Sequence, residues 1–483
     1  MRRFVLILLI SLTLPAISAC GSVASAHRVS SQTPSIEVAP ASGAAVAPLQ
    51  LNSRIPSAFI DISVDVPAPP PIDSEQLQLE MAELFALRSS LTEADQQTML
   101  AWDTQAVVRW NKLARDMVAQ YQVDPLQASS IYMLLSVAQN EALRTADTYQ
   151  RLYQRQMPPA AESGLTPLLT SAAPGSYPSE HALLAAASAT VLEYFFPGEQ
   201  SHIAAQRTEE QESRLWAGVN CRSDIIAGNQ AGSTIAALLI ERLRGEFAQA
   251  NVGMYEEPPH RPGAWIVDPT NPRPPDAPGW RRLAPWLMER ADQFRAPPPP
   301  EFGSAEYTLA LQEVRDISDH RTDEQLRIAQ FWNDGKGSPT PPGHWNQIAA
   351  DLIVAQGLGN QAAAKTLAYM NLALYDAGIA AWDTKYTYWL IRPWNADPAI
   401  QTVPAIPPSH PSYVSGHSTF SAAAATVLAA AFPEKAAELD AMVQEASVSR
   451  VYGGIHYRFD GEAGIAIGKQ VGALAVARMQ AEP

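Results

Sequence analysis

The stretch YVSGHSTFSAAAATVLAAAFP, residues 413–433, has a counterpart earlier in the chain. Residues 177–197 read YPSEHALLAAASATVLEYFFP, and their Tyr, Ser, His, Ala-Thr-Val-Leu and Phe-Pro positions match at one constant offset, which aligns His181 with His417. A second pair, SRLWAGVNCRSDIIAG (213–228) and SRVYGGIHYRFDGEAG (449–464), keeps the same offset without a gap. Ala-rich helices can look alike by chance, but chance does not reproduce one offset in two separate regions. The sequence therefore predicts two related units in tandem.

The segments around these pairs carry apolar residues at helical spacing. SEQLQLEMAELFALRSSL (74–91) is one example, and alternating strand patterns are nearly absent. We therefore predict an all-α fold of two tandem, related helical bundles, of which only the C-terminal one carries the active site. The predicted boundaries are an N-terminal, degenerate bundle at 76–250, a Pro-rich connector at 251–305, and a C-terminal catalytic bundle at 306–483.

Residues 1–20, MRRFVLILLISLTLPAISAC, have the two arginines, apolar run and small-residue ending of an export signal. Ile-Ser-Ala-Cys resembles the processing box of bacterial lipoproteins, which predicts a lipid anchor on Cys20 and a periplasmic or cell-surface location. Ordinary cleavage near Ala19 is the alternative. Residues 21–75 are rich in Ser, Ala and Pro, which predicts a disordered tether. Only Cys221 would then remain, so no internal disulfide is expected.

The composition restricts the class of partner. The chain of 483 residues has a formal net charge of -15 and a sequence with 47% hydrophobic residues. Binding to nucleic acid needs a broad basic surface, so no nucleic-acid partner is expected. An anionic ligand would have to be bound by a local group of cations. Whether the protein forms a homo-oligomer stays open.

The two copies serve as an internal control, because residues present in only one copy are candidates for chemistry. The offset aligns four residues of the second copy with different residue types in the first: Lys385 with Tyr149, Arg392 with Gln156, Gly416 with Glu180, and His456 with Asn220. The first copy thus lacks two cations, a small residue and an imidazole. We expect it to be inert, and the second copy to bind a multiply charged anion.

Three segments of the second copy supply the candidate residues. Lys385 and Arg392 are separated by about two helical turns, which places both side chains on roughly the same helix face. Ser415, Gly416 and His417 precede a helix, whose N-terminal N–H groups attract anions. Ser415 and His417 have equivalents in the first copy, so helix capping or packing is the alternative interpretation.

In the third segment, Arg450 and His456 flank a Gly-Gly break, and Asp460 follows His456 at the spacing of one helical turn. A carboxylate at that spacing can hold one ring nitrogen and leave the other free. Asp224 occupies the equivalent position in the first copy, so a purely structural role for Asp460 is equally compatible with the sequence.

These three segments resemble the signature of the superfamily of type-2 phosphatidic acid phosphatases and vanadium-dependent haloperoxidases. The resemblance implies that Lys385, Arg392 and Arg450 surround an oxyanion, with Ser415 and Gly416 as further donors. His456 would bind the vanadium of vanadate in a haloperoxidase, or attack phosphorus in a phosphatase. His417 would be the general acid or base. Val414 departs from the proline that usually precedes Ser-Gly-His.

Further features resemble the haloperoxidase branch. HYRFD (456–460) resembles its histidine block, Trp382 stands shortly before the lysine as an aromatic residue does there, and Asp334 would orient an arginine. His410 occupies a position that is often histidine in bromide-oxidising relatives. The resemblance implies a vanadate cofactor, with hydrogen peroxide and a halide, bromide or iodide favoured, as substrates.

The alternative is an acid phosphatase that hydrolyses a phosphate ester through a phosphohistidine intermediate, without a cofactor. The short spacing between Ser415 and Arg450 resembles the bacterial phosphatases.

Overall fold

The computed structural model describes residues 64–156, 158, 165–170, 173–268, 272–404 and 406–482, all of which belong to one compact unit, Gln50–Pro483. All regular elements within these described residues are helices. The strand-like pairings among them are two isolated bridges. The prediction of an all-α fold is confirmed. The predicted signal, Cys20 and the tether up to residue 63 lie outside the described residues. No described helix combines the length and the apolar character needed to cross a membrane.

The first half of the unit is built from helices, and residues 154–179 separate α4 from α6. Its helices are α1 (Glu75–Ser90), α2 (Glu93–Asp103), α3 (Ala106–Gln120), α4 (Pro125–Tyr153), α6 (Glu180–Phe195), η1 (Pro197–Glu199), α7 (Gln200–Ala217) and α8 (Arg222–Ala250). After the short helix η2 (Pro278–Arg282), the second half contains α9 (Ala305–His320), α10 (Asp323–Phe331), α11 (Thr340–Gln356), α12 (Asn360–Tyr388), α13 (Pro393–Ala396), α14 (Gly416–Ala431), η3 (Pro433–Lys435), α15 (Ala436–Tyr452) and α16 (Arg458–Ala481). We call α1–α8 the first repeat and α9–α16 the second repeat.

The helix bounds repeat along the chain. The starts of α6 and α14 are related by the same offset as the two sequence motifs, and so are those of α7 and α15 and of α8 and α16. A slightly shorter offset relates the start of α1 to that of α9, and the same shorter offset relates the start of α2 to that of α10. The offset changes because residues 332–339 connect α10 to α11, whereas residues 104–105 connect α2 to α3. The duplication therefore reaches further towards each repeat's beginning than the sequence comparison indicated.

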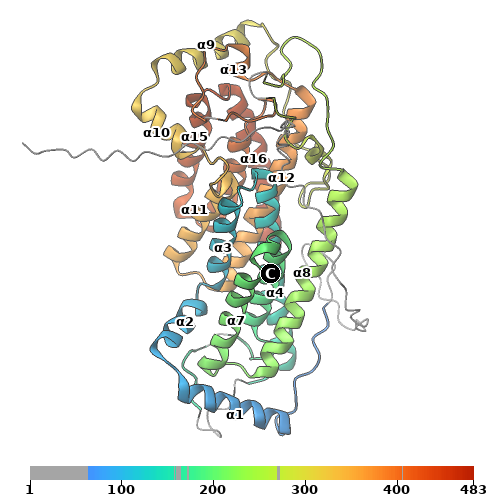
Figure 1. Cartoon of the computed structure of the whole chain (residues 1–483), viewed down its shortest axis with the longest axis vertical. Coiled ribbons are helices and arrows are strands. Elements are labelled where there is room, and N and C mark those ends of the chain that lie inside the picture. Colours follow the sequence, from blue (N-terminus) through green and yellow to red (C-terminus); the bar gives the residue numbers. More distant parts are fainter. Residues whose placement is uncertain are drawn as a thin grey trace, which may run out of the picture. The chain divides into compact units, whose positions relative to one another are not determined.

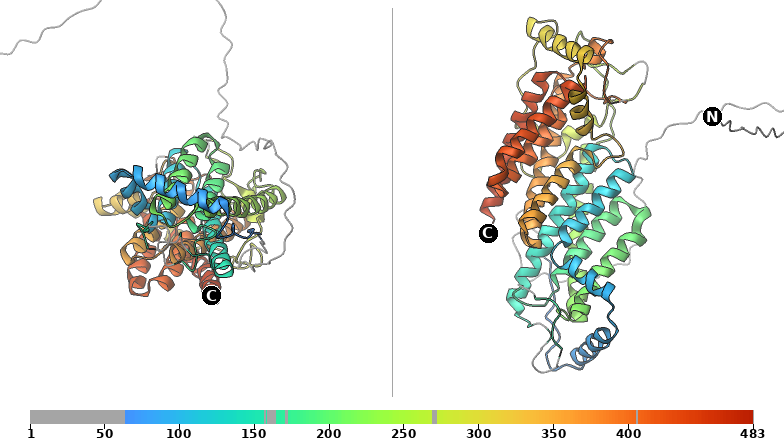
Figure 2. Two further views of the ribbon diagram at one scale, coloured as in Figure 1. Left: turned by 90° about the horizontal axis from the view of Figure 1, so that it is seen from below. Right: turned by 90° about the vertical axis from the view of Figure 1, so that its left-hand side faces the viewer.

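The two repeats meet along α4 and α12, which pack against each other between a blue-to-green and an orange-to-red group of helices (Figure 2). Leu126 lies against Gly378, and Ser136 Oγ accepts a hydrogen bond of 2.8 Å from Asn371 Nδ2, so the two helices are antiparallel. As a result, α1 and α9 lie at opposite ends of the unit (Figure 1). One hydrophobic cluster contains residues of both repeats.

Close helix packing explains the Ala-rich and Gly-containing pattern of the repeat. An added Cβ at Gly232 would lie 2.2 Å from the Leu183 carbonyl oxygen, and one at Gly468 would lie 2.3 Å from the Thr419 carbonyl oxygen. Both distances are too short for a side chain, so α8 approaches α6, and α16 approaches α14, through glycine. This close approach fixes the start of α14 against α16, where two of the candidate segments lie.

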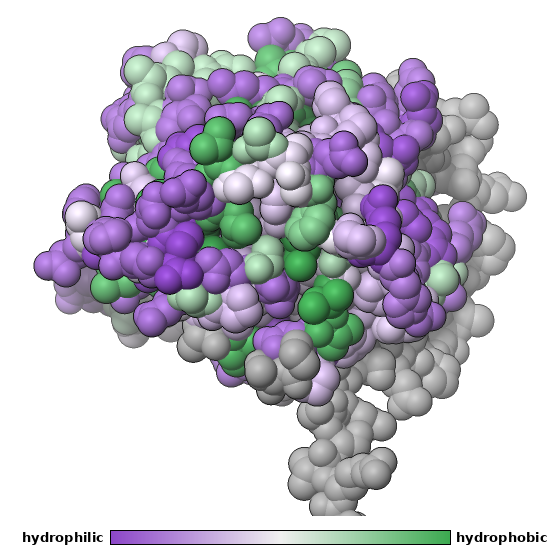
Figure 3. All heavy atoms as spheres, turned by 90° about the horizontal axis from the view of Figure 1, so that it is seen from above, coloured by the Kyte–Doolittle hydropathy of each residue, from purple (hydrophilic) through white to green (hydrophobic). Residues whose placement is uncertain are grey.

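The proline-rich connector packs on the second repeat. The backbone N–H groups of Trp286, Leu287 and Met288 donate to the Asp376 carboxylate at 2.9, 2.7 and 2.8 Å. Arg295 Nε donates to Asp383 at 2.6 Å, also on α12. The end of the unit that carries α9 and α13 has apolar residues scattered among hydrophilic ones (Figure 3).

The predicted tether is too long at its C-terminal end. Val64 and Val66 are buried, and their carbonyl oxygens accept hydrogen bonds from the hydroxyls of Tyr149 and Tyr153 at 2.8 and 2.6 Å. These backbone acceptors are paired inside the first repeat, so residues 64–66 are part of the packed fold rather than of a disordered segment.

Candidate active site

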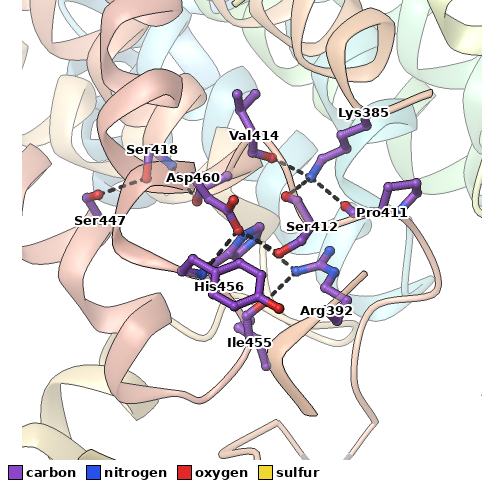
Figure 4. Close-up of polar contacts among 12 residues, drawn as sticks. Lys385, Arg392, Pro411, Ser412, Val414, Ser418, Ser447, Ile455, His456 and Asp460 are labelled. Carbon is purple, nitrogen blue, oxygen red and sulfur yellow. Dashed lines mark hydrogen bonds and ion pairs between the residues drawn. The ribbon is translucent and has the colours of Figure 1, made fainter. Parts of the chain in front are cut away.

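Lys385 lies in the last turn of α12 and is fully buried. Its Nζ donates to the carbonyl oxygens of Pro411, at 3.0 Å, of Ser412, at 2.9 Å, and of Val414 (Figure 4). These carbonyls belong to the segment that leads into α14. Lys385 therefore joins the end of α12 to the start of α14, as the sequence predicted for two parts of one site.

Arg392, at the start of α13, is also fully buried. Its Nε donates to the His410 carbonyl oxygen at 2.9 Å, and one terminal nitrogen donates to the Ile455 carbonyl oxygen at 2.7 Å. The same nitrogen lies 3.0 Å from His456 Nε2, and the other lies 3.0 Å from His410 Nδ1. The guanidinium thus lies between two imidazoles, one of them the predicted covalent residue.

His456 is oriented by Asp460. The distance between His456 Nδ1 and Asp460 Oδ2 is 2.7 Å, and the same oxygen accepts from Ser412 Oγ at 2.5 Å and from the Tyr457 backbone N–H at 3.1 Å. Asp460 therefore both caps α16 and orients the ring, so the structure shows both interpretations at once. An ionised carboxylate on Nδ1 places the proton there and leaves Nε2 with its lone pair.

Burial sets the protonation of this group. Burial, with Arg392 and Lys385 nearby, lowers the pKa of His456 well below its ordinary value, so the ring is neutral at neutral pH. Burial also raises the pKa of Asp460 to about 6, opposed by the Ser412 hydrogen bond, and the carboxyl is ionised at neutral pH. The pKa of Lys385 is lowered by burial and by Arg392. Two crowded, buried cations with one carboxylate favour the binding of an anion.

Ser415 and Gly416 form the start of α14. Ser415 is the N-cap, and its Oγ accepts from the Ser418 backbone N–H at 3.3 Å, as Ser179 does from Ala182 in the first repeat. Helix capping is thus the contact that the structure shows for Ser415. An added Cβ at Gly416 would meet only ordinary contacts, the nearest with the Trp382 ring at 3.6 Å. Packing does not require glycine at this position, which fits a space used by a ligand.

His417 and Arg450 lie beside this group. His417 Nε2 is buried without a hydrogen-bond partner among the described residues, and burial and the Arg450 charge lower its pKa. Arg450 donates from Nε to Ser449 Oγ and from a terminal nitrogen to the Ala329 carbonyl oxygen, both at 2.9 Å. His417 also lowers the pKa of His456 through its charge, which places the two rings within electrostatic reach of each other.

Asp334 lies in the connection between α10 and α11, the connection that is longer in the second repeat. Burial lowers the pKa of Arg450 to about 10, and the Asp334 carboxylate opposes this shift. Both Asp334 oxygens lie 3.1 Å from His344 Nδ1. The predicted neighbourhood of Asp334 and an arginine is therefore present, and the arginine is Arg450.

Trp382 and His410 form one wall of the group. Their ring centroids are 4.9 Å apart, and Trp382 Nε1 donates to the Asp276 carbonyl oxygen at 3.0 Å. Asp276 belongs to the connector, and its carboxylate also accepts from the Ser409 backbone N–H at 3.1 Å. The connector thus holds the loop that carries His410.

Sequence reasoning missed Ser412, His344 and Asp276. Ser412 directly precedes the repeated stretch at 413–433, Asp276 lies in the Pro-rich connector, and His344 lies ten residues after Asp334. Their contacts are with Asp460, Ser409 and Asp334, respectively. No spacing within one segment reveals such contacts.

One residue pairing between the repeats needs correction. Both α4 and α12 end at a residue with left-handed backbone conformation, Gln154 and Trp389, and their separation is one position shorter than the offset of the sequence motifs. This register places Gln150, not Tyr149, at the position of Lys385. Gln150 Nε2 donates to the Pro178 carbonyl oxygen at 2.9 Å, the equivalent of the Lys385 contact with Val414.

Part of the chain is similar to known proteins in sequence. Residues 364–482 match the family model of the PAP2 superfamily. Vanadium chloroperoxidase of Curvularia inaequalis is 27% identical over 216 residues, which cover 35% of this chain and 36% of that protein. The chain thus matches about a third of the length of this curated relative.

Two solved structures share the fold. A bacterial vanadium-dependent iodoperoxidase superposes with a TM-score of 0.62 and 23% identity, covering 77% of this chain and 95% of that chain. An apo-type bacterial vanadium-dependent chloroperoxidase gives a TM-score of 0.55 and 15% identity, covering 74% of this chain and 95% of that chain. The resemblance to the phosphatase and haloperoxidase superfamily is confirmed by the family match over residues 364–482. Over most of the chain, the two solved structures show a shared fold.

Proposed function

We propose that the protein is a vanadate-dependent haloperoxidase that oxidises a halide, bromide or iodide favoured, with hydrogen peroxide. The observation that carries the proposal is the environment of His456. Its Nδ1 is held by Asp460, its Nε2 faces Arg392, and Lys385 lies in the same buried group. The neutral imidazole provides one ligand for the metal of an oxyanion. The buried cations beside it compensate the charge of the oxyanion.

The residues present fit vanadate. The group contains three cations and two carboxylates, so its net charge is positive by one. The cations are Lys385, Arg392 and Arg450, and the carboxylates are Asp460 and Asp334. The space at Gly416 lies against the N-terminus of α14. Arg392, Arg450 and the start of α14 would hold the oxygen atoms, and His456 Nε2 would coordinate the metal. Lys385, whose three N–H groups donate to carbonyl oxygens, would contribute its charge. Bound vanadate would supply a Lewis acid that activates hydrogen peroxide for oxygen transfer to the halide.

The protein side chains have distinct tasks in this proposal. Asp460 keeps the proton on His456 Nδ1, so that Nε2 stays available. His417 Nε2, which is buried and has no partner among the described residues, would accept a proton from incoming hydrogen peroxide. Trp382 and His410 would border the approach of the halide, which gives His410 an influence on halide preference.

The second candidate is an acid phosphatase that acts through a phosphohistidine. The matched PAP2 family and the short spacing between Ser415 and Arg450 favour it. The same cations would stabilise the charge of a phosphoryl group in its transition state, and His456 Nε2 would attack phosphorus.

One experiment separates the two candidates. The apoprotein is purified and assayed with and without vanadate, for bromide and iodide oxidation by hydrogen peroxide and for hydrolysis of a phosphate monoester. We expect halide oxidation that depends on vanadate. Phosphate-ester hydrolysis that vanadate inhibits, without halide oxidation, would favour the phosphatase. His456→Ala should abolish either activity, and His202→Ala, an exposed histidine on α7, should abolish neither.

We also propose that the protein is exported and anchored through a lipid on Cys20, in the periplasm or at the cell surface. The N-terminal pattern that ends in Ile-Ser-Ala-Cys supports this proposal. Metabolic labelling with a radioactive fatty acid should label the wild-type protein and not Cys20→Ser. Labelling of both proteins, or of neither, would contradict the anchor.

A further inference from the structure

The first repeat contains a cavity of ≈ 440 Å³ where the second repeat has its candidate active site. Its volume lies in the range of small-molecule pockets. The start of α12, at residues 359–362, contributes to one side of it. The lining also includes the first-repeat equivalents of Gly416, His417, Arg450 and His456, namely Glu180, His181, Arg214 and Asn220. Asp103, at the end of α2, lines it as well. The two repeats thus place related groups around equivalent spaces.

The charge of this cavity is opposite to that of the candidate active site. Two cations line it, and both are neutralised by other lining residues: Arg151 pairs with Asp147, and Arg214 pairs with Asp103, each at 2.8 Å. The side-chain carboxyl group of Glu180 makes no hydrogen bond or ion pair with any described residue. The lining therefore carries one unpaired carboxyl group where the second repeat has Gly416 and an excess of cations.

The pKa of Glu180 is raised by burial, and the Arg214 charge opposes this shift. Glu180 is partly buried at the cavity wall, and a carboxyl in such a place without a partner is most stable as a carboxylate when a cation binds beside it. A positively charged ligand would therefore lower the pKa of Glu180 again and pair with the carboxylate.

His181 supplies a second group to the cavity. The ring is 5% exposed and lines the cavity, and its Nδ1 lies 2.9 Å from Oε1 of the fully buried Glu210. Glu210 Oε2 accepts from Trp110 Nε1 at 2.6 Å, which fixes the carboxyl group. His181 Nε2 has no partner among the described residues, so it is the ring nitrogen left for a ligand. The second repeat has Ala446 at the position of Glu210, so this carboxyl is specific to the first repeat.

The protonation of this pair defines what Nε2 offers. Burial raises the pKa of Glu210 to about 8, so the His181–Glu210 pair retains an extra proton at neutral pH. In either arrangement of that proton, on the carboxyl or on the ring, Nε2 carries an N–H. The cavity thus presents a carboxylate acceptor, Glu180, and an N–H donor, His181.

We propose that the cavity of the first repeat is a second ligand site that binds a small protonated amino alcohol. The ammonium group pairs with Glu180, and the hydroxyl oxygen accepts from His181 Nε2. Among the described residues, no group of three or more His, Cys, Asp or Glu side chains is placed to hold a metal ion, so the cation that this pair of groups fits is an organic one. The repeat that the sequence comparison suggested to be inert has exchanged the ligand rather than lost the site.

Isothermal titration calorimetry with ethanolamine hydrochloride on the full-length protein tests the proposal. We expect saturable binding of ethanolamine, with much weaker binding of ethylene glycol, which lacks the charge, and of ethylammonium, which lacks the oxygen. Glu180→Gln should weaken ethanolamine binding about 10- to 100-fold, the range for a hydrogen bond to a charged group. Glu193→Gln, the same change on the same helix outside the cavity lining, should leave binding unchanged.

Three results would overturn the proposal: no binding of ethanolamine by the wild type, equal binding of ethylene glycol, or undiminished binding by Glu180→Gln. If Glu180→Gln does not fold, the histidine ring resonances of the wild type decide. Ethanolamine must shift the His181 signal and leave that of His456 in place, and the reverse pattern would contradict the assignment. His456→Ala should still bind ethanolamine, so this test does not depend on the proposed haloperoxidase activity.

Discussion

Gln150 in the first repeat and Lys385 in the second make the same structural contact. Gln150 Nε2 donates to the Pro178 carbonyl oxygen at 2.9 Å, and Lys385 Nζ donates to the equivalent carbonyl oxygen of Val414. Both residues lie one turn before the left-handed end of their helix. In the first repeat, the Gln150 amide therefore joins α4 to the segment before α6 without adding a charge. In the second repeat, Lys385 joins α12 to the segment before α14 and adds a positive charge.

This relationship makes Lys385→Gln a clean test of the lysine charge. The variant should fold, because Gln150 shows that an amide fits one of the three carbonyl contacts of Lys385. Its melting temperature should fall, because the carbonyls of Pro411 and Ser412 lose their donor. Vanadate affinity should fall because one positive charge is lost from the buried group. Halide oxidation should fall about 100-fold or more, in the range for removing one group that stabilises a developing oxyanion. Equilibrium binding of vanadate and initial rates measure the two quantities.

Lys365→Gln is the matched control, since Lys365 lies on the same helix and its Nζ donates to the Glu482 carbonyl oxygen at 2.7 Å. The control should retain activity. Wild-type vanadate affinity in Lys385→Gln would show that Lys385 only links α12 to the start of α14.

Gly416→Glu places in the second repeat the carboxylate that Glu180 provides in the first. A carboxylate at the start of α14 would repel an oxyanion, so vanadate binding should fall by at least about 100-fold. Gly416→Ala separates size from charge, because an added Cβ meets its nearest neighbour at 3.6 Å. The alanine variant should fold normally and lose less affinity than the glutamate variant. Equal losses in both would mean that space, not charge, matters at this position.

Asp460→Asn should weaken vanadate binding about 10- to 100-fold, because the ring of His456 loses the carboxylate that fixes its proton on Nδ1. Asp460 also caps α16, so a stability cost is expected as well. Asp224→Asn in the first repeat gives an upper bound on that cost, since Asp224 caps α8 in the same way and also pairs with Arg155 at 3.0 Å. If the two variants lose equal stability and neither loses vanadate affinity, Asp460 has only a structural role.

Glu210→Gln should change how stability depends on pH. Burial raises the pKa of Glu210 to about 8, so the folded protein holds a proton there that the unfolded chain releases near 4.5. Stability contributed by this carboxyl therefore falls as pH rises towards 8. Burial lowers the pKa of His181, so the contribution of this ring makes the folded protein more stable as pH rises. This contribution changes only below pH 6.5, the pKa of the ring in the unfolded chain.

The informative window for this variant is thus pH 6.5 to about 8. Melting temperatures measured across it should fall more steeply for the wild type than for Glu210→Gln. The four buried aspartates whose pKa values are raised to about 6 lose their protons below this window and contribute little within it. Parallel curves for the two proteins would contradict the protonated state assigned to Glu210.

The helical spacing of apolar residues and the near absence of alternating strand patterns predicted the all-helical fold. The comparison of the two copies gave Lys385, Arg392 and His456 as candidates because the first copy has other residue types there. It paired Lys385 with the wrong residue, since the α4 and α12 ends are shifted by one position relative to the later helices. It missed the match of α1 with α9 because the longer connection before α11 changes the offset. Ser412 and Asp276 could not be predicted, because their contacts exist only after distant segments pack together.

Calorimetric titration of the apoprotein with vanadate tests most directly whether His456 and the surrounding buried cations form one oxyanion site in the second repeat. His456→Ala and the surface control His202→Ala are titrated in parallel. We expect one vanadate bound per chain in the wild type and in His202→Ala, and no binding in His456→Ala. Vanadate binding of equal affinity in His456→Ala, or none in the wild type, would contradict the proposed site.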